Sequence, residues 1–448
     1  MNKKISVNLA VAIAIIAMTV TFSVTMLLSM RMFDKTVSSV REKEIMYNKL
    51  AEIDKSVRAG YYGEINEDAL NDMLGAAYMA GIGDKYAQYY SAKQYSEWKE
   101  IQSGKVIGIG VDIVRDSSGY GRIIRVYTDS PAAQAGLVKN QFITRIGDTD
   151  VRTLTLNQMR SLLRGEAGTS VSLTVLDQTT GTEQPLEIQH SQYDRPTVFW
   201  EVPEGKAVGY VQITTFGENT ATELTAAAEA MLALETPVQA LVIDVRGNDG
   251  GSLEYAMDAI DALCPVGPIA SRRNKDGSVK LLDTSDNKEI ALPVAVLVNS
   301  STAAGAELFA TSVRDFGKGR IVGTTTAGKG MIVCDPEAKS DGSAIAYSIA
   351  TLLTKNGESF EGAGVKPDVE VILTADEETN LYSFTVDSDP QIVKAFEATA
   401  SLLNRQQNAA SGTSSSESAS VPADSTPAES TPAEPSSEIL PQSTSGAE

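Results

Sequence analysis

The sequence contains a single histidine, His190, and only two cysteines, Cys264 and Cys334, in 448 residues. A structural zinc site needs about four Cys or His ligands at close spacing. That class of site is therefore excluded, and we expect neither a metal nor a cofactor. A Ser-His-Asp or Cys-His site would have to be built on His190 alone, so nucleophilic chemistry in this chain would need another base.

Basic residues are also scarce, since 38 Lys and Arg face 58 Asp and Glu, which gives a net charge of −20. Nucleic-acid binding needs a basic face, so no nucleic-acid partner is expected. The content of 42% hydrophobic and 21% charged residues is typical of a globular protein. The length predicts two or three domains.

A stretch without charge covers residues 6–30 and consists mainly of Val, Ile, Ala, Leu, Met and Phe. About 20 apolar residues suffice to cross a bilayer, and no small-residue cleavage pattern follows. Together with Lys3 and Lys4, the stretch predicts a single-pass signal anchor in residues 1–35. The chain would then be attached to a cell membrane with its body outside the cytoplasm. A cleaved signal is the alternative.

The remaining chain divides into four parts. Residues 36–100 have apolar side chains at helical spacing and predict a helical segment. Residues 101–190 contain short β-rich runs separated by Gly, Asp and Ser. Residues 191–404 alternate strands with helices, which is typical of an α/β layered domain. Residues 405–448 are rich in Ser, Thr, Pro, Ala and Glu, and this composition predicts a disordered tail.

Individual elements can be predicted in the two middle parts. Strands are expected at 107–114, 122–127, 142–146 and 170–176, and then at 208–213, 240–245, 294–298 and 319–322. Helices are expected at 130–136, 221–234, 253–263 and 304–316.

The segment Ile107-Gly108-Ile109-Gly110 precedes one of these strands. The backbone N–H groups of such a loop can receive a terminal carboxylate while a peptide adds to the sheet edge as a strand. Residues 130–137 and 142–148 follow in an order that resembles a PDZ domain. The resemblance implies that Ile107, Gly108, Ile109 and Gly110 bind C-terminal tails of proteins. A small β-module without a ligand is the alternative.

Two further motifs belong to the α/β part. Residues 241–251 form an apolar strand that ends in a turn with Gly250 and Gly251, whose N–H groups could stabilise an oxyanion. An ordinary turn before a helix explains the same pattern. Residues 294–309 form a strand, a small-residue turn and a helix, as in nucleophile elbows. Lys329 follows in a Gly-Lys-Gly loop, and a desolvated lysine can act as a general base.

Together with residues 81–86 and 362–368, these motifs resemble the carboxyl-terminal processing peptidases, also called tail-specific serine proteases. The resemblance implies an α/β peptidase-like core with an inserted, mainly-β PDZ domain, an N-terminal helical segment and a disordered C-terminal tail. It also implies proteolysis near the C-termini of exported or membrane proteins of bacteria, by a Ser-Lys pair assisted by a Gln. Gly250, Gly251 and Gly305 are the candidates for the oxyanion hole. The oligomeric state is left open.

The sequence departs from this family pattern at two positions. The family's serine lies three residues before a glutamate and twenty-five before the lysine, so Glu307 and Lys329 both assign the nucleophile to Ala304. The expected glutamine, four residues after the lysine, falls at Val333. The base is therefore present, whereas the nucleophile and the residue that orients the base are absent.

Three interpretations follow. A pseudoenzyme that binds tails without cleaving them explains both substitutions. An engineered Ser-to-Ala form explains position 304 only. An active serine-type endopeptidase would have to use Ser300, Ser301 or Thr302 instead. Elsewhere, His190 is expected on the surface between two domains, and Cys264 and Cys334 either form a disulfide or remain free thiols.

Overall fold

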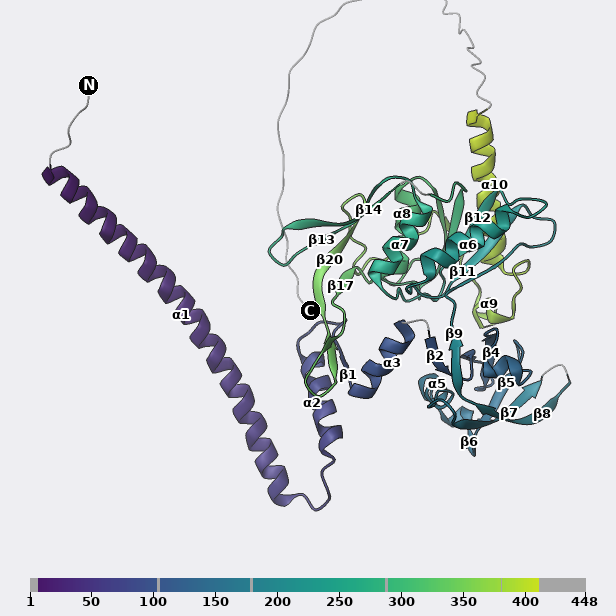
Figure 1. Ribbon diagram of the computed structural model, residues 1–448, viewed down its shortest axis with the longest axis horizontal. Helices are drawn as coiled ribbons and strands as arrows, with labels where there is room; N and C mark the ends of the chain where they lie inside the picture. Colours follow the sequence, from purple (N-terminus) through teal and green to yellow (C-terminus); the bar gives the residue numbers. More distant parts are fainter. Residues whose placement is uncertain (1–6, 103–104, 178–179, 287–288, 380, 411–448) are drawn as a thin grey trace, which may run out of the picture. The chain divides into compact units, whose positions relative to one another are not determined.

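A computed structural model describes residues 7–102, 105–177, 180–286, 289–379 and 381–410 (Figure 1). The chain forms two compact units, residues 1–98 with 333–348, and residues 99–332 with 349–448. The sequence assigned residues 333–348 to the α/β part, whereas the structure groups them with the N-terminal unit. Most of the predicted tail, residues 411–448, lies outside the described residues.

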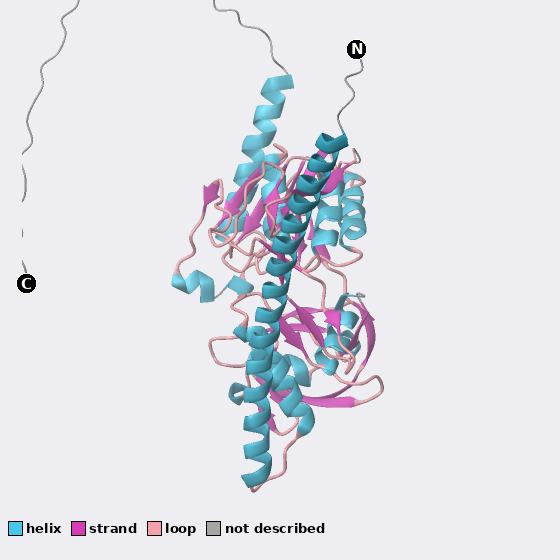
Figure 2. Cartoon of the chain, turned by 90° about the vertical axis from the view of Figure 1, so that its left-hand side faces the viewer, coloured by secondary structure: helices cyan, strands magenta, loops and turns pink. Residues whose placement is uncertain are grey.

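The N-terminal unit is mainly helical, as predicted. Its helices are α1 (Val7–Gly60), α2 (Glu67–Gly81) and most of α3 (Ala92–Gln102), and α1 runs without a break (Figure 2). The side chain of Asn66 accepts a hydrogen bond from the backbone N of Ala69 at 3.0 Å, which fixes the start of α2. A small sheet joins β1 (Gln88–Tyr90), β19 (Ala344–Ala346) and β18 (Glu337–Ala338).

The predicted membrane anchor coincides with the first part of α1, apart from residue 6, which lies outside the described residues. Among the residues that the structure describes, no helix combines the length and the apolar character needed to cross a membrane. The anchor predicted for residues 6–30 is therefore not supported.

The PDZ-like domain is an antiparallel sheet with strand order β3-β4-β5-β7-β8. These strands are β3 (Val111–Arg115), β4 (Gly121–Val126), β5 (Phe142–Ile146), β7 (Ser170–Asp177) and β8 (Thr182–Gln189), and β6 (Thr149–Asp150) pairs with β5. Two short helices, α4 (Pro131–Gln134) and α5 (Leu156–Leu162), complete the domain. Alternate strand residues such as Ile113 and Ile123 are buried, which is the period expected of a sheet with one covered face.

The strand predicted at 107–114 is in fact two strands. The first, β2 (Lys105–Gly108), pairs with β9 (Ser191–Asp194), and the second is β3. The extended conformation is interrupted at Gly110, whose φ is +84°. A Cβ atom at Gly110 would lie 2.2 Å from Cβ of Ser130, so this position requires glycine.

The expected surface position of His190 is wrong, because the side chain is only 4% exposed. His190 lies between β8 and β9, and its Nδ1 is 2.9 Å from Oγ1 of Thr169. Burial lowers the pKa of His190. Gly165 leaves room for the ring, since a Cβ atom there would lie 2.4 Å from Nδ1. A histidine that follows a polar strand gives no sign of such a pocket in the sequence.

The α/β core contains a six-stranded sheet of order β10-β11-β12-β15-β16-β21. The strands are β10 (Val198–Glu201), β11 (Val208–Ile213), β12 (Ala240–Asp244), β15 (Val294–Val298), β16 (Gly319–Gly323) and β21 (Val369–Glu370). All pairs are parallel except β10 with β11. Every residue of β12 and β15 is buried, because helices cover both faces. Strand β15 is therefore a continuous apolar run, and β12 is apolar up to Asp244 at its end.

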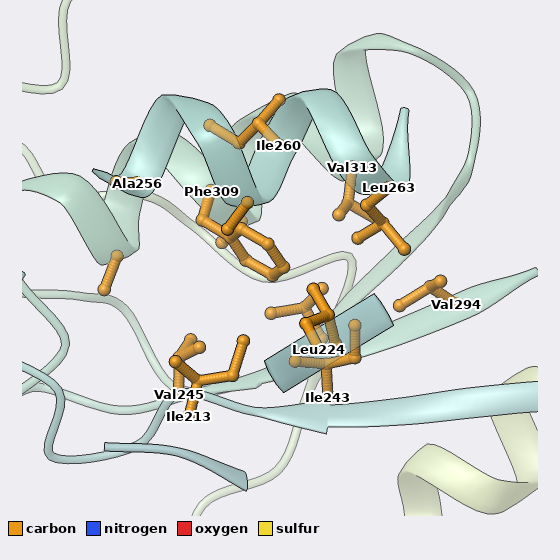
Figure 3. Close-up of a cluster of buried hydrophobic side chains, with 14 of the residues drawn as sticks. Ile213, Leu224, Ile243, Val245, Ala256, Ile260, Leu263, Val294, Phe309 and Val313 are labelled. Atoms are coloured by element: carbon orange, nitrogen blue, oxygen red, sulfur yellow. The ribbon is translucent and has the colours of Figure 1, made fainter. Parts of the chain in front are cut away.

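One face of this sheet packs against α6 (Thr220–Leu232), α7 (Leu253–Leu263) and α8 (Gly305–Asp315). Figure 3 shows Phe309 of α8 in this core with Leu224, Ile243 and Ile260. The opposite face packs against α10 (Pro390–Ala410), which the sequence analysis did not predict. Helix α10 also includes residues 405–410, which had been assigned to the tail.

A second sheet contains β14 (Val279–Ser285), β13 (Gly267–Arg273), β20 (Ser348–Thr354) and β17 (Met331–Val333). Helix α9 (Ala375–Thr379) precedes α10.

Phe309→Ala should lower the free energy of unfolding by about 3–5 kcal/mol, because it leaves a cavity in the main core. Leu232→Ala, at a side chain that is 43% exposed, should cost less than about 1 kcal/mol. Urea unfolding followed by far-UV circular dichroism measures both. Equal effects of the two substitutions would contradict the packing described here.

Candidate active site

Two turns at the carboxyl ends of β12 and β15 are joined by hydrogen bonds. The Asn299 side chain accepts from the backbone N of Gly247 at 3.0 Å. The hydroxyl of Thr302 donates to the carbonyl of Val245 at 2.9 Å, and the backbone N of Ala303 donates to the carbonyl of Asn248 at 2.9 Å. Parallel neighbouring strands place both turns at the same sheet edge, where sites of α/β proteins usually lie.

Asn248 shapes the glycine turn that was predicted to form an oxyanion hole. This side chain is completely buried; its Nδ2 donates to the carbonyl of Ile213, and its Oδ1 accepts from the backbone N of Gly250 at 2.9 Å. The N–H group of Gly250 is thus already bound. Gly251 packs against the carbonyl of Phe216, which a Cβ atom would approach to 2.4 Å.

Ala304 occupies the elbow between the β15 turn and α8 with φ 50° and ψ −115°. A residue with a side chain is strained in this region, and such strain is typical of sites where a side chain must be presented in one direction. Ala304 is one of three residues other than glycine with positive φ among those that the structure describes. The predicted nucleophile position therefore has an elbow backbone and a methyl side chain.

Gly305, the third oxyanion candidate, is the first residue of α8. Its N–H group has no acceptor within the helix, because the first N–H groups of any helix lack one. Gly250 lies directly beside it, since a Cβ atom on Gly250 would be 2.9 Å from both the Cβ of Ala304 and the N of Gly305. The structure thus brings Gly250, Ala304 and Gly305 together.

Glu307 connects the elbow to the lysine loop. Its buried carboxylate accepts from the backbone N of Ala304 at 2.9 Å, of Gly328 at 2.7 Å and of Lys329 at 2.8 Å, and from the hydroxyl of Thr326. Glu307 is at the third position of α8, so the positive end of the helix dipole stabilises its negative charge. One carboxylate therefore holds the predicted nucleophile position and the predicted base loop side by side.

The lysine loop is a close-packed segment. Gly328 accepts at its carbonyl from the backbone N of Gly362 at 2.9 Å, and a Cβ atom on Gly328 would lie 2.8 Å from the N of Gly364. Lys329 is half-buried. Val333, at the expected glutamine position, is the last residue of β17 and belongs to the N-terminal unit.

A buried charge cluster fixes the other side of the glycine turn. Arg246 contacts Asp244 at 2.7 Å and Asp389 at 2.9 Å, and Tyr210 donates to Asp244 at 2.7 Å. Burial alone would lower the pKa of Arg246, but the charges of Asp244 and Asp389 raise it overall. Asp389 also accepts from the backbone N of Gln391 at 2.9 Å, at the start of α10. This cluster ties the turn after β12 to α10.

The other candidate hydroxyl groups belong to residues that precede the elbow residue Ala304 in the chain. Ser300 and Ser301 are exposed, whereas Thr302 is buried and its hydroxyl is bound to Val245. Both cysteines are free thiols. Burial raises the pKa of Cys264 to about 12, so this thiol is not a nucleophile near neutral pH.

A cleft of about 370 Å³ adjoins the glycine turn. Gly108, Ile109 and Gly110 line it, as does Asp249 of the turn, whereas Ile107 does not. The predicted carboxylate-binding loop therefore opens onto the same cleft as the turn that carries Gly250.

An elbow, a glycine turn and a lysine loop on an α/β core, together with a PDZ-like domain, are the parts expected of a serine-peptidase class of fold. Residues 207–371 match peptidase family S41, and residues 122–177 match the PDZ domain.

The chain is 29% identical to "Carboxy-terminal processing protease CtpA" of Bacillus subtilis (strain 168) over 328 residues, covering 73% of this chain and 69% of CtpA. It is 27% identical to "Probable CtpA-like serine protease" of Staphylococcus aureus (strain MRSA252) over 363 residues, covering 80% and 72%. A solved structure assigned to the S41 proteases of Bacteroides fragilis NCTC 9343 has a TM-score of 0.52 and 19% identity, covering 77% of this chain and 99% of that one. The last likeness concerns the fold alone. These matches support the carboxyl-terminal processing peptidase family, with a peptidase S41 domain and a PDZ domain.

Sequence reasoning missed Asn248, Thr326 and Asp389 as parts of the site. In the sequence, Glu307 serves only to locate position 304. A glutamate at the third position of a helix is a known capping signal, and it could have indicated the bond to the N of Ala304. No local sequence pattern indicates that Asp389 belongs to the site, because it lies 143 residues after Arg246 in the chain.

Ala304→Gly should leave the free energy of unfolding unchanged or raise it by up to about 1 kcal/mol, because removal of Cβ relieves the strain at positive φ. Ala226→Gly, at an exposed position within α6, should lower it by about 1 kcal/mol. Urea unfolding compares the two variants. If Ala304→Gly destabilised as much as Ala226→Gly, the elbow would not be strained.

Proposed function

We propose that this chain binds the C-terminal tails of other proteins in its PDZ cleft and holds them beside a peptidase-like core that does not cleave them. The observation that carries the proposal is Ala304, a methyl group on an elbow backbone. A methyl group has no lone pair with which to attack a carbonyl carbon, so no acyl-enzyme forms. That the body lies outside the cytoplasm stays a prediction from the sequence.

The surrounding framework supports a loss of the nucleophile rather than a loss of the site. Glu307 still binds the backbone of Ala304 and Lys329, and the elbow keeps its strained φ of 50°. In this proposal Lys329 occupies the position of the base, and Gly305 with Gly251 occupies that of the oxyanion hole, because the N–H group of Gly250 is bound to Asn248. Such a core can bind a peptide without cutting it.

The position of the other hydroxyl groups argues against a replacement nucleophile. Thr302 would first have to break its bond to Val245, at a cost of about 1 kcal/mol or more. Ser300 and Ser301 precede the elbow by four and three residues. A displacement of even about 1 Å from the reacting geometry can cost roughly 100-fold in rate.

The unmodified chain should release no fluorophore above background from an unstructured peptide with an apolar C-terminus. Ala304→Ser should restore at most part of the family's activity, because Val333 offers no hydrogen bond to orient the lysine. Ala304→Ser with Val333→Gln should be more active than Ala304→Ser, since general-base assistance contributes roughly 10²–10⁴-fold.

Lys329→Ala is the control for this series and should abolish any turnover. Turnover by the unmodified chain that depends on Lys329 would overturn the proposal and move the nucleophile to Ser300, Ser301 or Thr302. Full activity of Ala304→Ser alone would instead favour an engineered Ser-to-Ala form.

Tail binding has its own test, which is independent of cleavage. A fluorescein-labelled peptide with a free C-terminal carboxylate should bind the full chain more tightly than the same peptide with an amidated C-terminus, because the backbone N–H groups of residues 107–110 favour a negative charge. Fluorescence anisotropy gives both dissociation constants. Equal values would rule out carboxylate capture.

A further inference from the structure

His190 is the only histidine of the chain, and its imidazole ring is enclosed in the PDZ-like domain. The residue joins β8 to β9, and its side chain is 4% exposed. On one side the ring lies against Gly165, where a Cβ atom would come within 2.4 Å of Nδ1. The peptidase-like site described above does not use this ring.

The hydrogen bonds around the ring determine which nitrogen carries the proton. The hydroxyl of Thr169 donates to the carbonyl of Glu166 at 2.7 Å, and a hydroxyl has a single hydrogen to donate. In its 2.9 Å contact with Nδ1 of His190, the hydroxyl is therefore the acceptor and the ring is the donor. The neutral ring then carries its proton on Nδ1. Its Nε2 is a buried acceptor that has no hydrogen-bond partner among the described residues.

A second proton on the ring would bind at Nε2 and create a buried positive charge. The elements around the ring are β2, β8, β9 and the loop of residues 163–169, whose titratable residues are Lys105, Glu187, Tyr193, Asp194, Arg164 and Glu166. Burial lowers the pKa of His190, and backbone groups of Thr169 and Leu163 offset this only in part, whereas none of those charges contributes. The charged ring is therefore unfavourable in the closed domain.

The loop of residues 163–169 is the part of the enclosure that can open. Residues 166–169 are exposed, so few buried contacts are lost when they move. Two backbone hydrogen bonds join the loop to His190. The N of His190 donates to the carbonyl of Thr169 at 2.7 Å, and the N of Gly168 donates to the carbonyl of His190 at 2.9 Å. An opened loop gives Nε2 access to water, which solvates the charged ring.

The same loop borders the predicted peptide cleft. Leu163 and Arg164 line the cleft, and so does Gly108, which pairs with Ser191, the residue after His190. A Cβ atom on Gly108 would lie 3.5 Å from the carbonyl oxygen of Leu163. The loop of residues 163–169 is thus in contact with the predicted carboxylate-binding loop, and its opening changes the wall of the cleft.

We propose that His190 is a pH-sensitive switch: uptake of a proton at Nε2 opens the loop of residues 163–169 and weakens the binding of C-terminal tails in the cleft. The effect on tails rests on the proposed function, because it assumes that the cleft binds them. The closed domain takes up this proton less readily than the open one, so the closed form loses stability as the pH falls below about 6.5, where an ordinary histidine titrates. Above that pH the ring is neutral in both forms.

Long-range ¹H–¹⁵N NMR of the full chain, labelled at histidine and made without a histidine tag, observes this one ring. At a pH of about 7.5 it should show the Nδ1–H tautomer, and the ring should titrate below about 6.5. Thr169→Val should give a mixture of tautomers, because Nδ1–H loses its acceptor. Thr153→Val is the matched control, since its hydroxyl also donates to the carbonyl three residues earlier, at 2.7 Å, and it should keep the Nδ1–H tautomer. An Nε2–H tautomer in the unmodified chain, or titration at or above about 6.5, would overturn the proposal.

Tail binding measures the consequence. By fluorescence anisotropy, a rhodamine-labelled peptide without titratable side chains should bind the full chain about three- to tenfold more weakly at a pH of about 5.5 than at about 7.5, since one pKa unit corresponds to about tenfold. His190→Asn, whose amide can still donate to Thr169 but does not titrate in this range, should have nearly the same dissociation constant at both pH values. Equal weakening in both proteins, or none in the unmodified chain, would overturn the proposal and leave tail binding intact.

A further measurement does not depend on the folding of His190→Asn. An excess of the peptide should lower the pKa of His190 in the NMR titration of the unmodified chain, because a tail that favours the closed loop also disfavours the proton. An unchanged pKa in the saturated complex would overturn the coupling. If the peptide binds at neither pH, the proposed function fails, whereas the tautomer and the titration of His190 still test the switch itself.

Discussion

The buried carboxylate of Glu307 is the interaction on which the peptidase-like site depends. An ionised carboxylate inside a protein costs several kcal/mol unless its lone pairs are satisfied. Here three backbone N–H groups and the hydroxyl of Thr326 satisfy them, and the N-terminus of α8 adds a favourable dipole. Because the donors come from both the elbow and the lysine loop, neither segment can move without removing at least one hydrogen bond from the buried carboxylate.

The strained backbone of Ala304 presents a side chain that has no reactive group. In an active serine peptidase the elbow strain directs a hydroxyl group toward substrate, whereas here it directs a methyl group. The turn is nevertheless held by Asn248, Asn299 and Glu307, whose hydrogen bonds do not depend on the residue type at 304. The geometry of the elbow therefore does not depend on a hydroxyl group at position 304.

Where both faces of a strand are covered, the sequence alone predicts the element well. The bounds of β15 agree with the predicted range, because it is an uninterrupted apolar run, and those of β11 agree although Gln212 interrupts its apolar residues. Helix α10 escaped prediction, since its buried residues Ile392, Ala395 and Phe396 are spaced among polar ones and follow an acidic loop. The site was predicted only as far as residue types allow, and contacts such as Asp389 with Arg246 depend on tertiary packing.

That last contact has a consequence for the order in which the protein folds. The turn after β12 is completed by Arg246, whose partners are Asp389, directly before α10, and Gln391 in its first turn, 145 residues later than Arg246. Closing so long a loop is slow, because chain entropy must be lost before the contact forms. During synthesis, the glycine turn must therefore wait for nearly the whole core to leave the ribosome, and until then Asp244 and Arg246 have only each other to neutralise their charges.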